Sequence, residues 1–207
     1  MGTFIKICGI TNAEDAENAV AFGADALGFI FAESPRRADP KNAKKILARI
    51  RGKALGVGVF VNESARRVEE TAEYCGLDVV QLHGDETSSY CANIKVDRVI
   101  KAFRIKDIAS LKAIKGYDNV FAYLLDTFSK DTYGGTGRAF DWNIAVKAKS
   151  LGKPIILSGG LNSGNIGEAI KVIRPYGVDI SSSIESEPGK KDAGLMKCII
   201  EEIKALD

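Results

Sequence analysis

Short runs of β-branched and other apolar residues alternate along the chain with segments whose apolar residues recur at helical spacing. The runs repeat about every 26 residues, which is typical of βα units that build a parallel sheet. Helices are expected between the runs and after the last one. The predicted strands are residues 4–8, 25–31, 54–61, 78–82, 98–103, 119–126, 154–158 and 178–181.

Eight βα units in one domain form either an open doubly wound sheet or a closed barrel. The first strand is not followed by a G-x-G-x-x-G dinucleotide motif, and no shift in composition marks a second domain. The chain has 207 residues, at the lower limit of the usual length of such barrels. The sequence therefore predicts an α/β fold, a single-domain (β/α)8 TIM barrel that spans residues 1–207.

The first helix should begin soon after the first strand. Thr11 and Glu14 have the spacing of a capping box, in which the threonine oxygen accepts a backbone N–H and the glutamate reaches back. This pattern places the predicted helix start just after Gly9.

The strand 4–8 turns a cation and a thiol to the same side. Successive side chains of a strand face opposite ways, so Ile5 and Ile7 are expected under the helices. Lys6 and Cys8 then face the barrel interior, with Cys8 at the end of the strands where barrel enzymes carry their chemistry. Cys8 is either a functional thiol or a small buried filler. Lys6 forms either a structural ion pair or a ligand contact.

A carboxylate is expected to join the thiol at the barrel mouth. Leu124 and Asp126 share one face of the strand 119–126, and Asp126 is the last residue on that face. A long polar loop follows directly after it. Asp126 is therefore predicted to point into the mouth.

Small residues follow the last three predicted strands. Barrels often bind phosphate at the loops after strands seven and eight, where backbone N–H groups and a helix N-terminus present partial positive charge. The segment 134–137 suits either a closing loop or close approach of an anion. The later loops are either a phosphate site or places where helix and strand pack tightly. The candidate phosphate-binding residues are Gly134, Gly135, Gly159, Gly160, Ser182 and Ser183.

Further candidates for substrate contacts follow the second and fourth strands. Arg36 and Arg37 lie in a proline-containing turn, which is either a solvated loop or, beside a phosphate site, a binding place for a second anion. Gln81 and His83 share a face at the end of the strand 78–82. They either orient substrate or fill a packing position.

Charge and cysteine content narrow the class of protein. The 29 lysines and arginines balance 27 aspartates and glutamates, so no field suited to nucleic acid or a membrane surface is expected. The sequence has no secretory leader pattern and no apolar run of membrane-spanning length, which predicts a cytoplasmic protein. One histidine and scattered cysteines predict no metal site. Free thiols are expected at Cys8, Cys75, Cys91 and Cys198.

Several motifs occur in order over nearly the whole chain: "KICGIT" at 6–11, "SPR" at 34–36, "QLHG" at 81–84, "LLDT" at 124–127, "GGTGRAFDW" at 134–142, "LSGGL" at 157–161 and "VDISS" at 178–182. The ordered set resembles the phosphoribosylanthranilate isomerase family. The resemblance implies a (β/α)8 barrel that performs the Amadori rearrangement of N-(5-phosphoribosyl)anthranilate to 1-(2-carboxyphenylamino)-1-deoxyribulose 5-phosphate in tryptophan biosynthesis. It implies no cofactor and a small phosphosugar as ligand. For the assembly, a monomer or homodimer is expected.

The same resemblance implies roles for individual residues. Cys8 corresponds to the general base of the family and Asp126 to its general acid. Arg36 is similar to the arginine that holds the anthranilate carboxylate, and Asp179 resembles a residue that contacts the sugar. Ser183 departs from the family pattern, which has glycine there, and this puts the backbone geometry of the phosphate site in question.

The implied reaction needs an acid and a base on one bound substrate, because the ribose ring must open and C2′ must then lose a proton. A free thiol with pKa about 8.5 is mostly protonated at neutral pH, so the pKa of Cys8 is expected to be lowered. The start of the first helix or the ammonium of Lys6 would supply that change. Asp126 must hold a proton, which burial or the substrate's anions would favour.

Two other functions are compatible with part of these sequence features. An indole-3-glycerol phosphate synthase-like barrel or a phosphosugar epimerase would share the phosphate loops. However, metal-dependent epimerases need several histidine and carboxylate ligands, and the synthase needs more catalytic lysines and acids than the strand ends provide. A non-catalytic phosphosugar-binding protein would not require Cys8 and Asp126 together.

Overall fold

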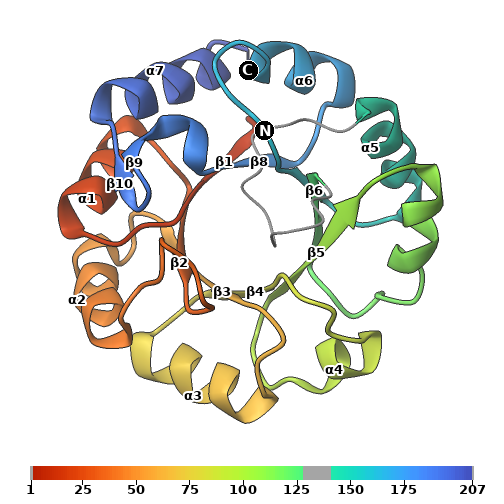
Figure 1. Cartoon of the computed structure of the whole chain (residues 1–207), viewed down its shortest axis with the longest axis horizontal. Coiled ribbons are helices and arrows are strands. Elements are labelled where there is room, and N and C mark those ends of the chain that lie inside the picture. The colour runs from red at the N-terminus through yellow and green to blue at the C-terminus, as the bar shows by residue number, and fades with distance from the viewer. Residues whose placement is uncertain (1, 128–140, 207) are drawn as a thin grey trace.

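The predicted barrel is confirmed. The structure is a computed structural model that describes residues 2–127 and 141–206. Within these residues, parallel strands β1 to β8 close in sequential order into a barrel, with helices around the outside (Figure 1). The strands are β1 (Phe4–Cys8), β2 (Ala26–Ile30), β3 (Leu55–Phe60), β4 (Val79–Leu82), β5 (Val99–Ile105), β6 (Ala122–Thr127), β7 (Ile155–Leu157) and β8 (Gly177–Ile180).

Helices connect the strands on the outside of the barrel, as expected for right-handed βα crossovers. The crossover after β5 is a 3-10 helix, η1 (Ile108–Ile114), and not an α-helix. Two shorter 3-10 turns are η2 (Lys149–Leu151) and η3 (Ser182–Ile184). The α-helices are α1 (Ala13–Phe22), α2 (Pro40–Ile50), α3 (Ala65–Cys75), α4 (Ser88–Asn93), α5 (Trp142–Ala148), α6 (Ile166–Ile173) and α7 (Ala193–Lys204).

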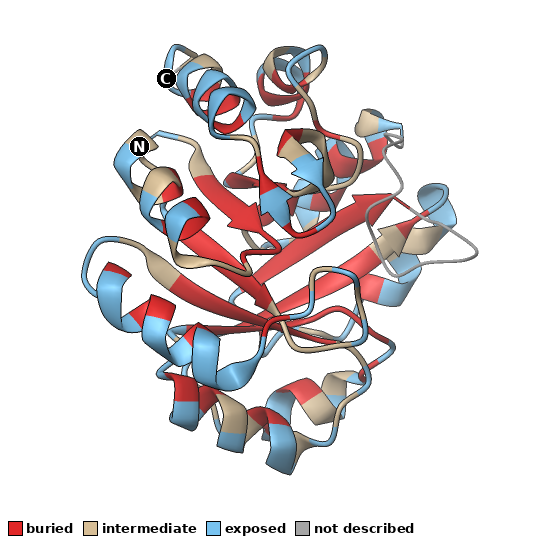
Figure 2. Ribbon diagram, turned by 60° about the vertical axis from the view of Figure 1, so that its left-hand side comes forward, coloured by how far each residue is buried: buried red, intermediate tan, exposed pale blue. Residues whose placement is uncertain are grey.

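The core has two parts, one between the strands and the helices and one inside the barrel. The barrel strands are mostly buried, whereas each helix exposes its outer face (Figure 2). Ile5 and Ile7 pack under the helices, as the strand alternation predicts. The interior holds small and aliphatic side chains, and it also holds the buried cations Lys6 and Lys101.

The start of the first helix differs from the prediction. Asn12, and not Thr11, caps α1, because its side chain accepts the N–H of Asp15 at 2.9 Å. The hydroxyl of Thr11 instead donates to the carbonyl of Gly189, which lies far away in sequence. An asparagine is as good a cap as a threonine, and this long-range hydrogen bond uses the threonine elsewhere.

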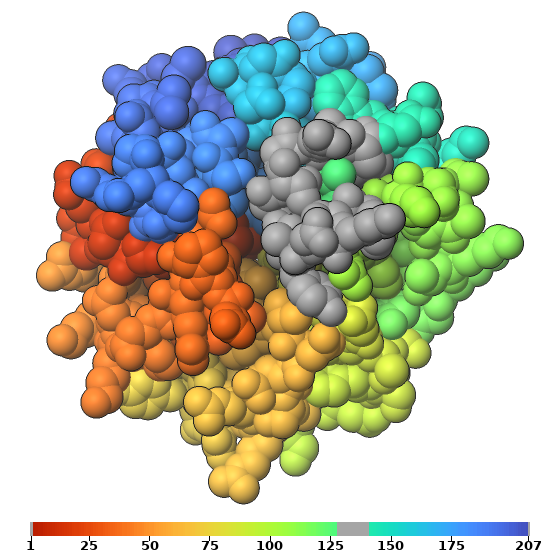
Figure 3. Space-filling model, in the orientation of Figure 1, coloured from red at the N-terminus to blue at the C-terminus, as the bar shows by residue number. Residues whose placement is uncertain are grey.

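A small two-stranded hairpin follows β8 and was not predicted. Strands β9 (Glu185–Glu187) and β10 (Lys190–Lys191) pair in antiparallel fashion before α7 begins. The hairpin lies at the barrel mouth, and Figure 3 shows it in blue against the orange loop that follows β2.

Candidate active site

Cys8, Lys6 and Asp179 form a polar cluster where β1 lies between β2 and β8. Lys6 is fully buried and donates from Nζ to Oδ1 of Asp179 at 2.7 Å, so it makes the ion pair that was one of its two expected roles. Cys8 is also buried and lies beside Gly28 of β2. A Cβ on Gly28 would lie 2.8 Å from Sγ of Cys8 and 3.1 Å from Nζ of Lys6. The thiol and the ammonium therefore approach the same point.

The electrostatics of Cys8 differ from the expectation. Burial raises the pKa of the Cys8 thiol above its ordinary value, and the charge of Asp179 adds to the rise. Lys6 and Lys191 lower the pKa, as proposed for Lys6, but they do not outweigh burial. Our prediction of a lowered pKa is therefore wrong for this structure, because desolvation of the thiolate is the larger effect.

Lys6 remains suited to act as a cation in this cluster. Burial alone would lower its pKa, but the charges of Asp179 and Cys8 outweigh that effect, and the pKa of Lys6 is raised. An ammonium that stays charged beside the thiol favours the thiolate over the neutral form.

Asp126 is the second-to-last residue of β6, and its carboxylate is buried in the mouth. Its Oδ1 accepts the N–H of Thr127 at 2.8 Å, and its Oδ2 lies 3.1 Å from Nε2 of His83. These two contacts hold the carboxylate in one orientation. The structure thus places Asp126 at the carboxyl end of the barrel, as its position on the strand predicts.

His83 and Gln81 form a short chain of hydrogen bonds that ends on Asp126. The amide Nε2 of Gln81 donates to Nδ1 of His83 at 2.9 Å. Because Nδ1 then accepts, Nε2 carries the hydrogen and donates it to Asp126. Gln81 is fully buried and His83 nearly so. Both side chains therefore face the acid and not open solvent.

Gly159 contacts the same carboxylate from the loop after β7. Its φ is +84°, a left-handed conformation that favours glycine. A Cβ there would lie 2.6 Å from Oδ1 of Asp126 and 2.5 Å from the backbone nitrogen of Thr127. A glycine is needed at this position because the loop backbone packs directly on the acid.

The remaining phosphate-site candidates divide into two groups. Gly160, Ser182 and Ser183 lie in the loops after β7 and β8, at the carboxyl end of the barrel. The carbonyl of Gly160 accepts the side-chain amides of Asn162 and Asn165, while its N–H has no protein acceptor among the described residues. Such a free N–H suits an anion. Gly134 and Gly135 lie outside the described residues.

Ser183 fits the backbone where the family has glycine. Among the described residues, positive φ angles occur outside glycine only at Asn62 and Arg174, so Ser183 does not adopt the strained left-handed conformation. Its Oγ is buried and has no hydrogen-bond partner in the described part of the chain. The serine therefore brings an unused hydroxyl to the loop without backbone strain.

We expect Ser183→Gly to change the affinity for a phosphorylated ligand by less than about tenfold, equivalent to 1.4 kcal/mol, because the backbone is already compatible with a Cβ. The measurement is the inhibition constant of a non-reactive phosphorylated product analogue for both forms at one ionic strength. Tightening beyond tenfold would show that Ser183 damages the site. Weakening beyond tenfold would show that its hydroxyl is a phosphate ligand.

Arg36 makes an ion pair that sequence reasoning missed. Its guanidinium contacts Glu185 of the β9–β10 hairpin at 2.8 Å, and Lys191 contacts the same carboxylate at 2.8 Å. Arg37, by contrast, is exposed. The sequence signal for this contact is weak, because Arg36 and Glu185 are separated by 149 residues and no spacing rule connects them.

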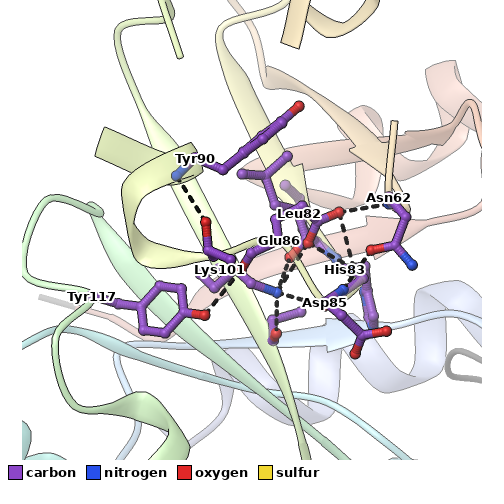
Figure 4. Close-up of polar contacts among 12 residues, drawn as sticks. Asn62, Leu82, His83, Asp85, Glu86, Tyr90, Lys101 and Tyr117 are labelled. Atoms are coloured by element: carbon purple, nitrogen blue, oxygen red, sulfur yellow. Dashed lines mark hydrogen bonds and ion pairs between the residues drawn. The ribbon is translucent and has the colours of Figure 1, made fainter. Parts of the chain in front are cut away.

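A second buried ion pair supports the loop that carries His83. Lys101 of β5 and Glu86 are 3.1 Å apart and almost completely buried. Lys101 donates to the carbonyls of Leu82 and Gly84, the residues on either side of His83, at 3.2 and 2.7 Å (Figure 4).

Glu86 completes this support from the other side. Its carboxylate accepts the backbone N–H groups of Asn62 and Gly84 and so ties the loop after β3 to the loop after β4. In Figure 4 these contacts converge on Glu86 and Lys101 beside His83. Neither Lys101 nor Glu86 was predicted from the sequence.

Among the described residues, no group of three or more His, Cys, Asp or Glu side chains is placed to hold a metal ion. Within the same ranges, no helix is both long enough and apolar enough to cross a membrane. The thiol and carboxylate at the mouth are groups that can transfer protons.

The closed barrel and the polar groups at its mouth define a TIM-barrel enzyme of the proton-transfer kind. A family model described as N-(5'phosphoribosyl)anthranilate (PRA) isomerase matches residues 5–202. The chain belongs to the N-(5'-phosphoribosyl)anthranilate isomerase family, and it catalyses this isomerisation in the biosynthesis of tryptophan.

Individual relatives agree with this assignment. The N-(5'-phosphoribosyl)anthranilate isomerase of Geobacter metallireducens is 52% identical over 202 residues, covering 97% of this chain and 98% of the relative. The crystal structure of the Thermotoga maritima enzyme matches with a TM-score of 0.92 at 39% identity, covering 99% of this chain and 100% of that chain. A phosphoribosyl anthranilate isomerase solved with reduced 1-(o-carboxyphenylamino)-1-deoxyribulose 5-phosphate matches at 0.89 and 38%, with the same coverage.

Proposed function

We propose that Cys8 is the general base and Asp126 the general acid of this isomerisation. One observation carries the proposal: a buried thiol beside an ammonium and a buried, firmly held carboxylate both lie at the carboxyl end of the barrel. Because an aldose-to-ketose rearrangement moves protons on one bound substrate, it needs two such groups at the same mouth.

The steps follow from the chemistry of the two groups. Asp126 delivers a proton to the ring oxygen as the bond between C1′ and that oxygen breaks, which leaves an open-chain imine. The thiolate of Cys8 removes the proton from C2′, and the electron pair forms the C1′–C2′ double bond of an enaminol. The enaminol tautomerises to the ketone, so the product contains the same atoms as the substrate.

Lys6 and Lys191 support the base in this scheme. Burial raises the pKa of Cys8, and both cations act in the opposite direction. The ion pair of Lys6 with Asp179 keeps this cation in place beside the thiol. Asp179 would then contact the sugar and anchor Lys6 at the same time.

His83 acts in this proposal by positioning Asp126. Its Nε2–H donates to Oδ2 of Asp126, while the side-chain amide of Gln81 donates to Nδ1 and so fixes the tautomer of the imidazole. The contact holds the side chain of Asp126 in one orientation, from which its protonated form would donate to the ring oxygen. Gln81 and His83 would thus support substrate binding mainly through the acid.

Two sites at the mouth would bind the two anionic ends of the substrate. The phosphate would bind to N–H groups of the loops after β7 and β8, including those of Gly160, Ser182 and Ser183. The anthranilate carboxylate would bind to Arg36, because a guanidinium matches a carboxylate geometrically. We also propose the cytoplasm as the place of action and a monomer or homodimer as the assembly. A matching solved structure described as "monomers of dimeric" enzyme is compatible with both assemblies.

We expect Arg36→Ala to weaken substrate binding by about 10- to 150-fold, because charged hydrogen bonds contribute roughly 1.5–3 kcal/mol. The measurement is KM together with the inhibition constant of a reduced product analogue. Arg37→Ala is the control, since Arg37 is exposed and adjacent in sequence. Equal effects of the two substitutions, or no effect of Arg36→Ala, would show that Arg36 does not hold the carboxylate.

A further inference from the structure

We propose that Glu185 is a positioning residue that aims Arg36 at the carboxylate of the substrate and so makes the enzyme select carboxylated ligands. This inference rests on the proposed role of Arg36. It assigns a function to the β9–β10 hairpin, which the reaction scheme does not otherwise use.

The contact between Arg36 and Glu185 occupies one defined edge of the guanidinium. Nε of Arg36 lies 3.0 and 2.9 Å from the two carboxylate oxygens of Glu185, and Nη2 lies 2.8 Å from Oε2. A guanidinium has five N–H donors, and the edge formed by Nη1 and Nη2 can bind a second carboxylate. In the described part of the chain Nη1 has no partner. Glu185 therefore holds the Nε–Nη2 edge of the guanidinium and leaves the Nη1–Nη2 edge available for a substrate carboxylate.

Glu185 is itself firmly held. Lys191 donates to its Oε1 at 2.8 Å and also to the carbonyl of Ser181 at 3.1 Å, and the side chains of Lys191 and Glu185 are both buried. Burial alone would raise the pKa of Glu185, but the hydrogen bonds from Arg36 and Lys191 outweigh it, and the pKa is lowered. The carboxylate therefore stays charged, and Lys191 holds it beside Arg36.

The stem of Arg36 is fixed on the side of the catalytic strand. A Cβ on Gly9, the residue after Cys8, would lie 2.9 Å from Cδ of Arg36, so the arginine packs directly on the backbone there. The N–H of Arg36 donates to Oγ of Ser34 at 3.1 Å. The guanidinium is thus held from the stem and from Glu185, close to the proposed base.

The charge of this cluster points to an anionic ligand. One carboxylate, Glu185, lies between two cations, Arg36 and Lys191, so the three groups carry one net positive charge. Lys6 does not change this balance, because it is paired with Asp179, and Cys8 does not change it while it is a neutral thiol, the form that its raised pKa favours. A substrate carboxylate at the open edge of Arg36 would neutralise the excess charge.

The test compares Glu185→Gln with Glu187→Gln, which changes an exposed glutamate on the same strand. The affinities are measured for two reduced product analogues, one with the ring carboxylate and one made from aniline. We expect Glu185→Gln to weaken binding of the carboxylated analogue about tenfold and to leave the aniline analogue within about twofold. For the natural reaction KM should rise while kcat stays within about threefold. Glu187→Gln should change none of these values.

Equal weakening of both analogues, or an unchanged ratio of their affinities, would overturn the inference and leave Glu185 a structural residue. If Glu185→Gln does not fold, Lys191→Gln removes the second cation that holds the Glu185 carboxylate. This variant should likewise lower the affinity for the carboxylated analogue relative to the affinity for the aniline analogue. Arg36→Ala separates the two proposals. If it leaves the ratio unchanged, the proposed role of Arg36 fails. If Arg36→Ala lowers the affinity for the carboxylated analogue relative to the aniline analogue and Glu185→Gln does not, only the role of Glu185 fails.

Discussion

Cys8→Ala and Asp126→Asn are each expected to lower kcat by at least about a hundredfold, the contribution typical of a proton-transfer group. Each substitution removes the titrating group and little volume, so the positioning of the substrate should survive. Binding of a reduced product analogue should therefore change by less than about threefold. The measurement combines steady-state kcat with the inhibition constant of that analogue for each variant.

Cys91→Ala is the matched control for the thiol, because Cys91 is also a buried free cysteine but lies on α4, outside the mouth. It should leave kcat unchanged. Near-normal turnover of either active-site variant would remove that residue from the mechanism. A large loss of thermal stability in Cys8→Ala, with turnover retained, would instead identify Cys8 as a packing residue.

Lys101→Met is expected to destabilise the protein by about 3–5 kcal/mol, because it breaks a buried ion pair and leaves the other charge without its partner. Methionine keeps the length of the side chain but cannot donate to the carbonyls of Leu82 and Gly84. The free energy of unfolding from urea denaturation provides the measurement. Since those carbonyls flank His83, the folded variant should also show a reduced kcat with Asp126 in place.

Lys171→Met is the control for this change, because Lys171 is an exposed lysine on α6 and should lose no more than about 0.5 kcal/mol. The double variant Lys101→Met/Glu86→Gln should be more stable than Lys101→Met alone, since it no longer buries an unpaired carboxylate. A cost below about 1 kcal/mol for Lys101→Met would show that the pair does not support the loop.

The fold could be predicted because its signals are local. Each strand is a short apolar run, and the alternation of side chains within β1 and β6 places Lys6, Cys8 and Asp126 inside the barrel. The sequential order of the strands then follows from the choice of a closed barrel over a doubly wound sheet, which the missing dinucleotide motif after the first strand favours. The sequence could thus identify which residues lie at the mouth without any knowledge of their contacts.

The parts that could not be predicted depend on contacts between distant segments. Asn12 and not the predicted Thr11 caps α1, because the hydroxyl of Thr11 donates to the carbonyl of Gly189. No local sequence pattern indicates that hydrogen bond. The ion pair between Glu185 and Arg36 joins the β9–β10 hairpin to the loop after β2, and these two segments meet only when the barrel closes.

The pKa of Cys8 illustrates the same limit. Its neighbour Lys6 could be identified from the strand, and it does act to lower the pKa. The depth of burial, which has the larger and opposite effect, depends on how the whole mouth packs.

The most direct test of the catalytic pair follows the loss of fluorescence of N-(5-phosphoribosyl)anthranilate after purified protein is added, with a chelator present. We predict rapid decay with the native chain and, with Cys8→Ala/Asp126→Asn at the same concentration, decay no faster than about a hundredth of that rate. The double variant should still bind the reduced product analogue. Decay within about tenfold of the native rate in the double variant would contradict the assignment of Cys8 and Asp126 as base and acid.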